Sequence, residues 1–292
     1  GGAVTVLALL PWLFDSSFAL TLLSQMGIVV VFALSYNMIF GQCGMLSFGH
    51  AVYSGLGAYG AVHALNALTA AGGPWGSPVT VALLPLVGGL TGALCGVLLG
   101  YPTTRRAGTS FAMITLGIGE MTHAAALMFP GLFGGEGGLS TNRVAGPPIA
   151  GISFGPAIEV YYLIIAWCLI ATALMYRFSQ TPLGLIANAV RDNAERAEFL
   201  GYSARRVRYR VLIASSFFAG IAGALGAINF ELVTAENLSS LQSGAVLLAT
   251  FIGGTAWFIG PVLGAIVYVL FSLALSDYTP AWLLYLGLFF IA

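Results

Sequence analysis

Glu120 and His123 are the two residues whose types and spacing could do chemistry within an otherwise apolar stretch. They lie three positions apart, so a helix would place both side chains on one face. A carboxylate inside a membrane is costly without a partner, and such a pair could carry protons. The pair could equally be a structural contact buried between helices. Residue type and spacing leave both interpretations open.

A glycine-rich stretch at residues 41–60 surrounds Ser47 and His50. Glycine at this density lets helices pack closely, and it also permits a helix to unwind where its backbone lines a pathway. Close packing is the simpler interpretation, and a transport pathway is the functional one. The polar residues that could line a pathway are Asn37, Ser47, His50, Thr115 and Glu120.

The segment from Thr181 to Gly201 predicts one short helix that does not cross the membrane. Thr can cap a first turn, Pro182 fits the first helical position, and glycine commonly follows a helix end. Two oppositely charged pairs lie one turn apart on one stripe: Arg191 with Glu195, and Asp192 with Arg196. Another face is nearly apolar: Ile186, Ala189, Asn193, Ala197 and Leu200. The helix could be a connector on the membrane surface or a docking site for a cytoplasmic partner.

The composition requires a membrane environment for the helices that hold these residues. Of the 292 residues, 59% are hydrophobic and only 7% are charged, too few to cover the surface of a soluble domain. The net charge of zero gives no reason to expect nucleic acid as a partner. Cys43, Cys95 and Cys168 lack metal-site spacing and are interpreted as small buried hydrophobes, so we expect no metal and no cofactor.

Apolar stretches long enough to cross about 30 Å of hydrocarbon follow one another along the chain. We expect an all-α transmembrane bundle that forms one domain over residues 1–292 and has about ten spans. The predicted spans lie near 3–14, 18–40, 48–70, 79–101, 108–129, 157–178, 209–230, 241–256, 258–276 and 279–292.

The arginines orient this bundle. Seven of the ten lie between Arg177 and Arg210, together with only three acidic residues. Because short cytoplasmic loops retain cations, we expect a cytoplasmic loop at 179–208, a periplasmic loop at 130–156 and cytoplasmic termini. The arginines at 205–210 fit this topology and contact with anionic membrane lipid. The sequence has neither a phosphate-binding loop nor any lysine, so energy for transport would come from a partner or an ion gradient.

Four motifs, spread over about residues 41–290, resemble the branched-chain amino acid ABC transporter permease family of the LivM type. The first comprises Gly41, Gly44, Leu46, Ser47, Gly49, His50, Gly55, Gly57, Ala58 and Tyr59. The second comprises Arg106, Gly108, Phe111, Ala112, Thr115, Leu116 and Glu120. The third, the most specific, comprises Pro182, Gly184, Ala189, Arg191, Asp192, Asn193, Ala197, Glu198, Leu200 and Gly201. The fourth comprises Gly253, Gly254, Gly260, Pro261, Gly264 and Ala265.

The resemblance implies a permease subunit in a bacterial inner membrane, not an enzyme, that forms the pathway for branched-chain amino acids or similar solutes. Its implied partners are a homologous permease subunit, two cytoplasmic ABC ATPases and a periplasmic solute-binding protein. The third motif is similar to the family's ATPase-coupling loop, which makes docking the favoured interpretation. The candidate coupling residues are Arg191, Asp192, Asn193, Glu195, Arg196, Glu198 and Gly201. The alternatives are a urea or amide ABC permease and an ion-coupled secondary transporter that uses Glu120 and His123.

Overall fold

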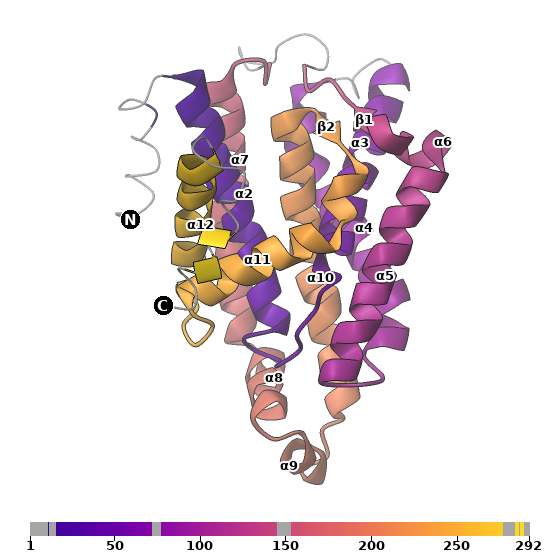
Figure 1. Ribbon diagram of the computed structural model, residues 1–292, viewed down its shortest axis with the longest axis vertical. Helices are drawn as coiled ribbons and strands as arrows, with labels where there is room; N and C mark the ends of the chain where they lie inside the picture. The colour runs from indigo at the N-terminus through magenta and orange to yellow at the C-terminus, as the bar shows by residue number, and fades with distance from the viewer. Residues whose placement is uncertain are drawn as a thin grey trace.

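The computed structural model describes residues 11, 16–71, 77–144, 153–276, 284–285 and 287–288. The regular secondary structure of this part of the chain is helical except for one short strand pair, β1 (Leu139–Ser140) and β2 (Leu232–Val233). The helices are α2 (Ser17–Ile39), α3 (His50–Ala71), α4 (Pro78–Thr103), α5 (Thr109–Met128), α6 (Pro130–Phe133), α7 (Ala157–Ser179), α8 (Pro182–Asp192), α9 (Ala194–Phe199), α10 (Ala204–Phe230), α11 (Ser240–Gly253) and α12 (Gly260–Ser276). Two 3-10 turns, η2 (Gly135–Gly137) and η3 (Ala235–Leu238), complete the described elements (Figure 1).

Five helices are both long and apolar enough to cross a membrane: α2, α4, α5, α7 and α10. Helix α3 has 22 residues, enough to reach about 33 Å, but its glycines and polar side chains make it less apolar. These helices coincide with the predicted spans from 18–40 to 209–230, so the chain is a polytopic helical membrane protein. The predicted spans near 3–14 and 279–292 fall almost entirely outside the described residues.

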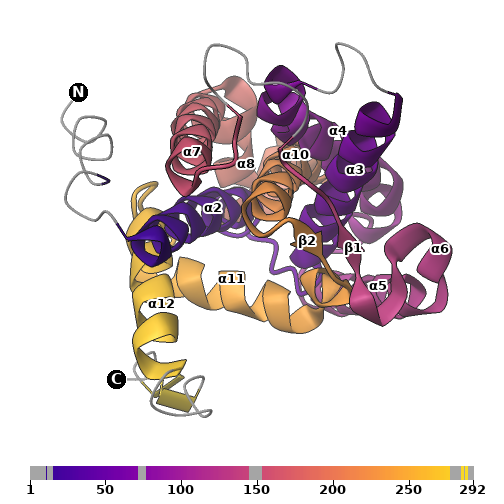
Figure 2. The same ribbon diagram turned by 90° about the horizontal axis from the view of Figure 1, so that it is seen from above.

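Helix α11 is too short to cross the membrane by itself. Its 14 residues extend about 21 Å, against a hydrocarbon thickness of about 30 Å. It ends at Gly254, whose φ of 81° interrupts the helical path. Figures 1 and 2 show α11 running across the bundle, whereas α7 and α10 run along it. The prediction of a complete span at 241–256 is therefore not confirmed, because apolar composition alone does not fix where a helix ends.

Helix α10 forms the centre of the bundle, with α2, α3, α4 and α7 around it (Figure 2). Glycines allow this close packing, because a Cβ atom on Gly220 would lie 2.1 Å from the carbonyl oxygen of Gly88 on α4. A Cβ atom on Gly57 of α3 would lie 2.5 Å from the Cα atom of Gly220. At Gly57, the glycine-rich stretch therefore serves close packing between three helices.

The two ends of the bundle differ in charge. Nine of the ten arginines lie at the end that carries α8, α9 and the start of α10, and the guanidinium groups of Arg105 and Arg205 lie 4.7 and 5.2 Å from the ring centre of Tyr101. Arg143 lies at the opposite end with β1 and β2, where its side chain donates to the carbonyl oxygens of Phe154 (2.8 Å) and Asn229 (3.1 Å). The predicted orientation rests on this separation of charge and stays a prediction.

Candidate functional site

The segment expected to be one helix is two helices, α8 and α9, that meet at Asn193. Asn193 has an extended backbone (φ −158°, ψ 101°), and its side-chain oxygen accepts a hydrogen bond from the amide of Arg196 at 2.9 Å. An asparagine side chain can satisfy the free amides of a new helix, and this capping competes with continuation of the old one. The predicted ends are confirmed: Thr181 caps α8 through the amide of Gly184 at 3.3 Å, and Gly201 follows α9 with a φ of 88°.

This break changes which side chains face the bundle. Ala187 and Val190 of α8 are buried, whereas Ala189, predicted to lie on the apolar face, is exposed. At the end of α9, Phe199 is 91% exposed and the following residue, Leu200, is 73% exposed. The predicted apolar face assumed a continuous helix, and the break at Asn193 divides this face between α8 and α9. Phe199, which carries no charge and stands in no motif, was not among the predicted coupling residues.

Arg191, Glu195, Arg196 and Glu198 are all exposed, but the guanidinium of Arg191 reaches back to the bundle. The Arg191 guanidinium pairs with Asp192 at 3.0 Å and donates to the carbonyl oxygen of Gly41. Gly44 has a φ of 69°, and a Cβ atom there would lie 2.9 Å from Cγ of Arg191. Arg191 therefore joins α8 to the 40–49 connection between α2 and α3.

Ser47 and His50 are fully buried at the inner part of this connection. The hydroxyl of Tyr36 donates to the carbonyl oxygen of Ser47 at 3.0 Å and accepts from its amide at 3.3 Å. His50 Nε2 lies 3.0 Å from Ser35 Oγ, and its ring stacks on Phe32 with 5.5 Å between ring centres. These contacts hold the connection against α2, and a pathway role for Ser47 and His50 stays a prediction.

Thr115 and Asn37 are buried at different places. Thr115 Oγ1 accepts from the amide of Phe48 at 3.2 Å and so fixes the 40–49 connection to α5. Asn37 borders a polar cavity of about 280 Å³ near α8, together with Gln42 and Arg191. Of the five predicted pathway residues, Asn37 lines this cavity.

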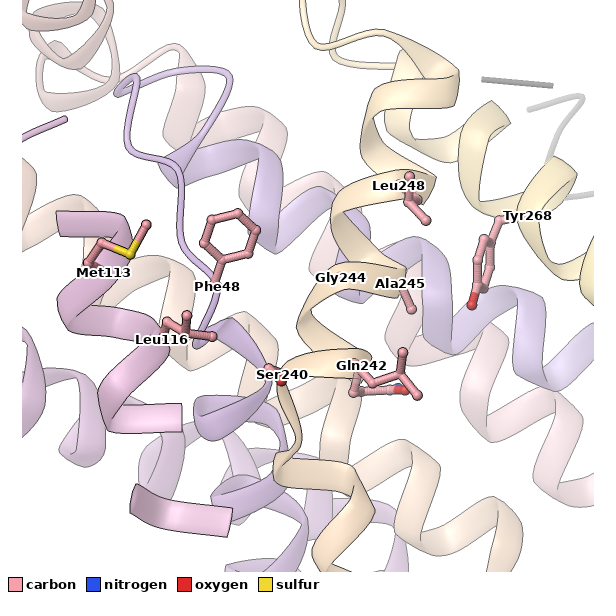
Figure 3. A pocket seen from close by; sticks show the side chains of 10 residues that line it. Phe48, Met113, Leu116, Ser240, Gln242, Gly244, Ala245, Leu248 and Tyr268 are labelled. Carbon is pink, nitrogen blue, oxygen red and sulfur yellow. The ribbon is translucent and has the colours of Figure 1, made fainter. Parts of the chain in front are cut away.

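A larger cavity of about 690 Å³ lies between α5, α11 and α12 (Figure 3). Phe48 projects into it from the 40–49 connection, beside Met113 and Leu116 of α5. Its lining residues are Phe48, Met113, Leu116, Ser240, Leu241, Gln242, Gly244, Ala245, Leu248 and Tyr268. We call this cavity the α5–α11 groove. No motif indicated it, because its walls come from segments far apart in the sequence.

Glu120 and His123 do not form a pair. Glu120 is exposed halfway along α5, and it makes no hydrogen bond or ion pair with any residue that the structure describes. His123 Nδ1 lies 2.9 Å from the carbonyl oxygen of Ala235 in η3, so this nitrogen carries the proton and donates it to that oxygen. His123 is thereby held by η3.

The cysteines have no metal-site arrangement in the described residues, where no group of three potential ligands occurs. Cys43 and Cys168 are buried as predicted, and Cys95 is half-buried. Burial raises the pKa of the Cys43 thiol to about 12, so this thiol stays protonated at neutral pH.

The apolar bundle, its one-sided arginines and its projecting helix pair define a polytopic helical membrane protein. The chain belongs to the family described as "Branched-chain amino acid transport system / permease component", which it matches over residues 18–292. The family resemblance found in the motifs is thereby confirmed.

Individual relatives support this membership. The chain is 28% identical over 283 residues to the high-affinity branched-chain amino acid transport system permease protein LivM of Escherichia coli (strain K12), covering 89% of this chain and 64% of that protein's length. It is 24% identical over 302 residues to the probable branched-chain amino acid transport permease protein LivM of Methanocaldococcus jannaschii, covering 89% and 85%. It is 30% identical over 221 residues to the autoinducer 2 import system permease protein LsrC of Enterobacter sp. (strain 638), covering 70% and 58%. No solved structure matches the chain.

Proposed function

We propose that this chain is the permease subunit of an ABC importer for branched-chain amino acids or similar small amino-acid-like solutes. It works in a bacterial inner membrane with about ten spans and with α8 and α9 on the cytoplasmic side. Its partners are a homologous permease subunit, two cytoplasmic ATPases and a periplasmic solute-binding protein. Family membership and the names of the two LivM relatives support this proposal.

The observation that carries the proposal is the exposed apolar tip of the α8–α9 pair. This pair projects beyond the bundle at its arginine-rich end (Figure 1). Phe199 and Leu200 are 91% and 73% exposed there, next to the exposed charges of Glu195, Arg196 and Glu198. Adjacent exposed apolar side chains rimmed by charge are typical of a protein contact. A soluble ATPase that covers Phe199 and Leu200 explains their exposure in the isolated chain.

The contacts of α8 also provide a route from this tip to the α5–α11 groove. Arg191 fixes α8 to Gly41 and packs on Gly44. The same connection continues to Phe48, which lines the groove and whose amide is held by Thr115 of α5. A contiguous chain of contacts of this kind can carry a displacement between distant sites. Movement of α8 by the ATPase would therefore reach the groove through Arg191.

Co-purification combined with solute uptake distinguishes docking of the ATPase at Phe199 and Leu200 from transmission of its movement through Arg191. Phe199→Ser with Leu200→Ser should release the ATPases from the purified complex, because it removes the apolar contact. Arg191→Met keeps the aliphatic stem and the tip, so the ATPases should stay bound while solute uptake falls. Phe18→Ser serves as the matched control, since Phe18 is 65% exposed at the start of α2 and at the other end of the bundle.

Each variant is first checked for a single, unaggregated species in detergent. Retention of the ATPases by the Phe199→Ser, Leu200→Ser variant would contradict the docking assignment. Full uptake by the Arg191→Met variant would contradict the transmission route.

A further inference from the structure

Glu120 is a carboxylate in a membrane-spanning helix that has no cation beside it among the described residues. It stands at the twelfth position of the 20-residue helix α5 and is exposed, without a partner among the described residues. A charged carboxylate facing hydrocarbon costs at least about 2.5 kcal/mol near the bilayer centre. This face of α5 therefore borders something other than lipid in the working transporter.

The chain itself offers no cation to Glu120. Nine arginines lie at the α8–α9 end, and the sequence has no lysine. The tenth, Arg143, already donates to the carbonyl oxygens of Phe154 and Asn229. His123, one turn away on α5, is held by the carbonyl oxygen of Ala235. A charged Glu120 therefore needs a cation from outside the described chain.

Helical spacing places Glu120 beside the α5–α11 groove. Positions 113, 116 and 120 lie on one face of a helix, and Met113 and Leu116 line the groove. Glu120 follows Leu116 by four residues, which is about 6 Å along the axis. Phe48, Ala245 and Leu248 make the other parts of the lining largely apolar. The groove thus combines an apolar wall with a carboxylate one turn from its edge.

We propose that Glu120 binds the ammonium group of an apolar amino acid whose side chain lies in the α5–α11 groove. An amino acid of this class supplies an ammonium for Glu120 and apolar surface for Phe48, Met113 and Leu116, and Ser240 and Gln242 in the groove lining are the donors available to its own carboxylate. Hydrogen bonds between an ammonium and a carboxylate strengthen where water is excluded. Glu120 is then a specificity-determining residue of the pathway. This assignment deepens the proposed function and rests on it.

The first test measures uptake of radiolabelled L-leucine by the complete complex in proteoliposomes. Glu120→Gln keeps the side-chain shape and removes the charge, so uptake should fall between about tenfold and a hundredfold, the range for a lost charged hydrogen bond. Glu120→Asp should retain most of the uptake lost in Glu120→Gln. Glu136→Gln is the matched control, because it removes one exposed carboxylate from η2, outside the groove.

The second test measures occupancy of the groove directly. Leu116→Cys is introduced into a Cys95→Ser background, because Cys95 is the half-buried native thiol. L-Leucine should slow maleimide labelling at position 116 when Glu120 is present, and it should not do so with Glu120→Gln. 4-Methylpentanoate has the same carbon skeleton without the amino group, and it should not protect.

Three results would overturn the assignment. Equal protection by L-leucine and 4-methylpentanoate would show that no ammonium is recognised. Unchanged uptake with Glu120→Gln would show that the carboxylate does not bind the solute. Loss of the partner permease from the Glu120→Gln complex would assign the carboxylate to a subunit interface.

Failure of the proposed function can be told apart from failure of this assignment. If the proposed function is wrong, the unaltered complex shows no ATP-dependent uptake, whereas the labelling result at position 116 is unaffected.

Discussion

At the scale of single residues, Gly44 and Arg191 control the junction between the projecting helices and the bundle. Gly44 adopts a φ of 69°, and its missing side chain leaves room for the stem of Arg191. Asp192 orients the guanidinium that donates to Gly41. The junction therefore depends on Gly44 in two ways: through its left-handed backbone and through the contact of Arg191 at the place of its missing side chain.

Gly44→Ala should destabilise the chain more than Gly201→Ala does. Both glycines have positive φ values, 69° and 88°, so each substitution costs about 1 kcal/mol in backbone strain. Only at Gly44 would the new Cβ atom meet Arg191, at 2.9 Å, because nothing lies within 4 Å at Gly201. Thermal unfolding of the purified variants in detergent measures the difference, and equal melting temperatures would contradict the tight junction.

Residue types in the sequence predicted some of these roles and not others. Thr181 and Gly201 were correctly assigned as helix ends, because a capping hydroxyl and a glycine act through their nearest neighbours. The inward direction of Arg191 could not be predicted, since its acceptor lies 150 residues away at Gly41. The exposure of Phe199 also depends on the break at Asn193, which a helix-periodic pattern does not reveal.

At the scale of elements, uniform apolar composition determined the long helices α2, α4, α7 and α10, which were predicted to within a few residues at most ends. Helix α11 and the α8–α9 pair were less predictable. Gly254 ends α11 early, and Asn193 starts a second cap in the middle of a helical pattern. In both cases one residue overrides the periodicity of its neighbours.

Close packing of α10 is tested by two substitutions on that helix. Gly220→Ala should destabilise the bundle by about 1–3 kcal/mol, because its Cβ atom would overlap the carbonyl oxygen of Gly88 on the backbone of α4. Gly226→Ala has open space around its Cβ atom and should be neutral or stabilising by up to about 1 kcal/mol. Thermal unfolding in detergent compares the two, and the reverse order of stability would contradict the packing.

At the scale of the whole molecule, the sequence established a membrane bundle, its charge asymmetry and its family. It did not establish the α5–α11 groove, because the walls of the groove come from the 40–49 connection, α5, α11 and α12. Glu120 was predicted as a pathway residue, and its position one turn from the groove explains how it could act there. The contact route from α8 through Arg191 and Phe48 connects the cytoplasmic end to this groove.

The most direct test of the proposed function is solute uptake by defined components in proteoliposomes. With the partner permease, ATPases and loaded binding protein present, L-leucine uptake should require ATP and should be unaffected by collapse of the proton gradient. Removal of the ATPases should abolish it. Uptake by this chain alone, driven by a proton gradient in ATP-depleted vesicles, would contradict the account and favour an ion-coupled transporter.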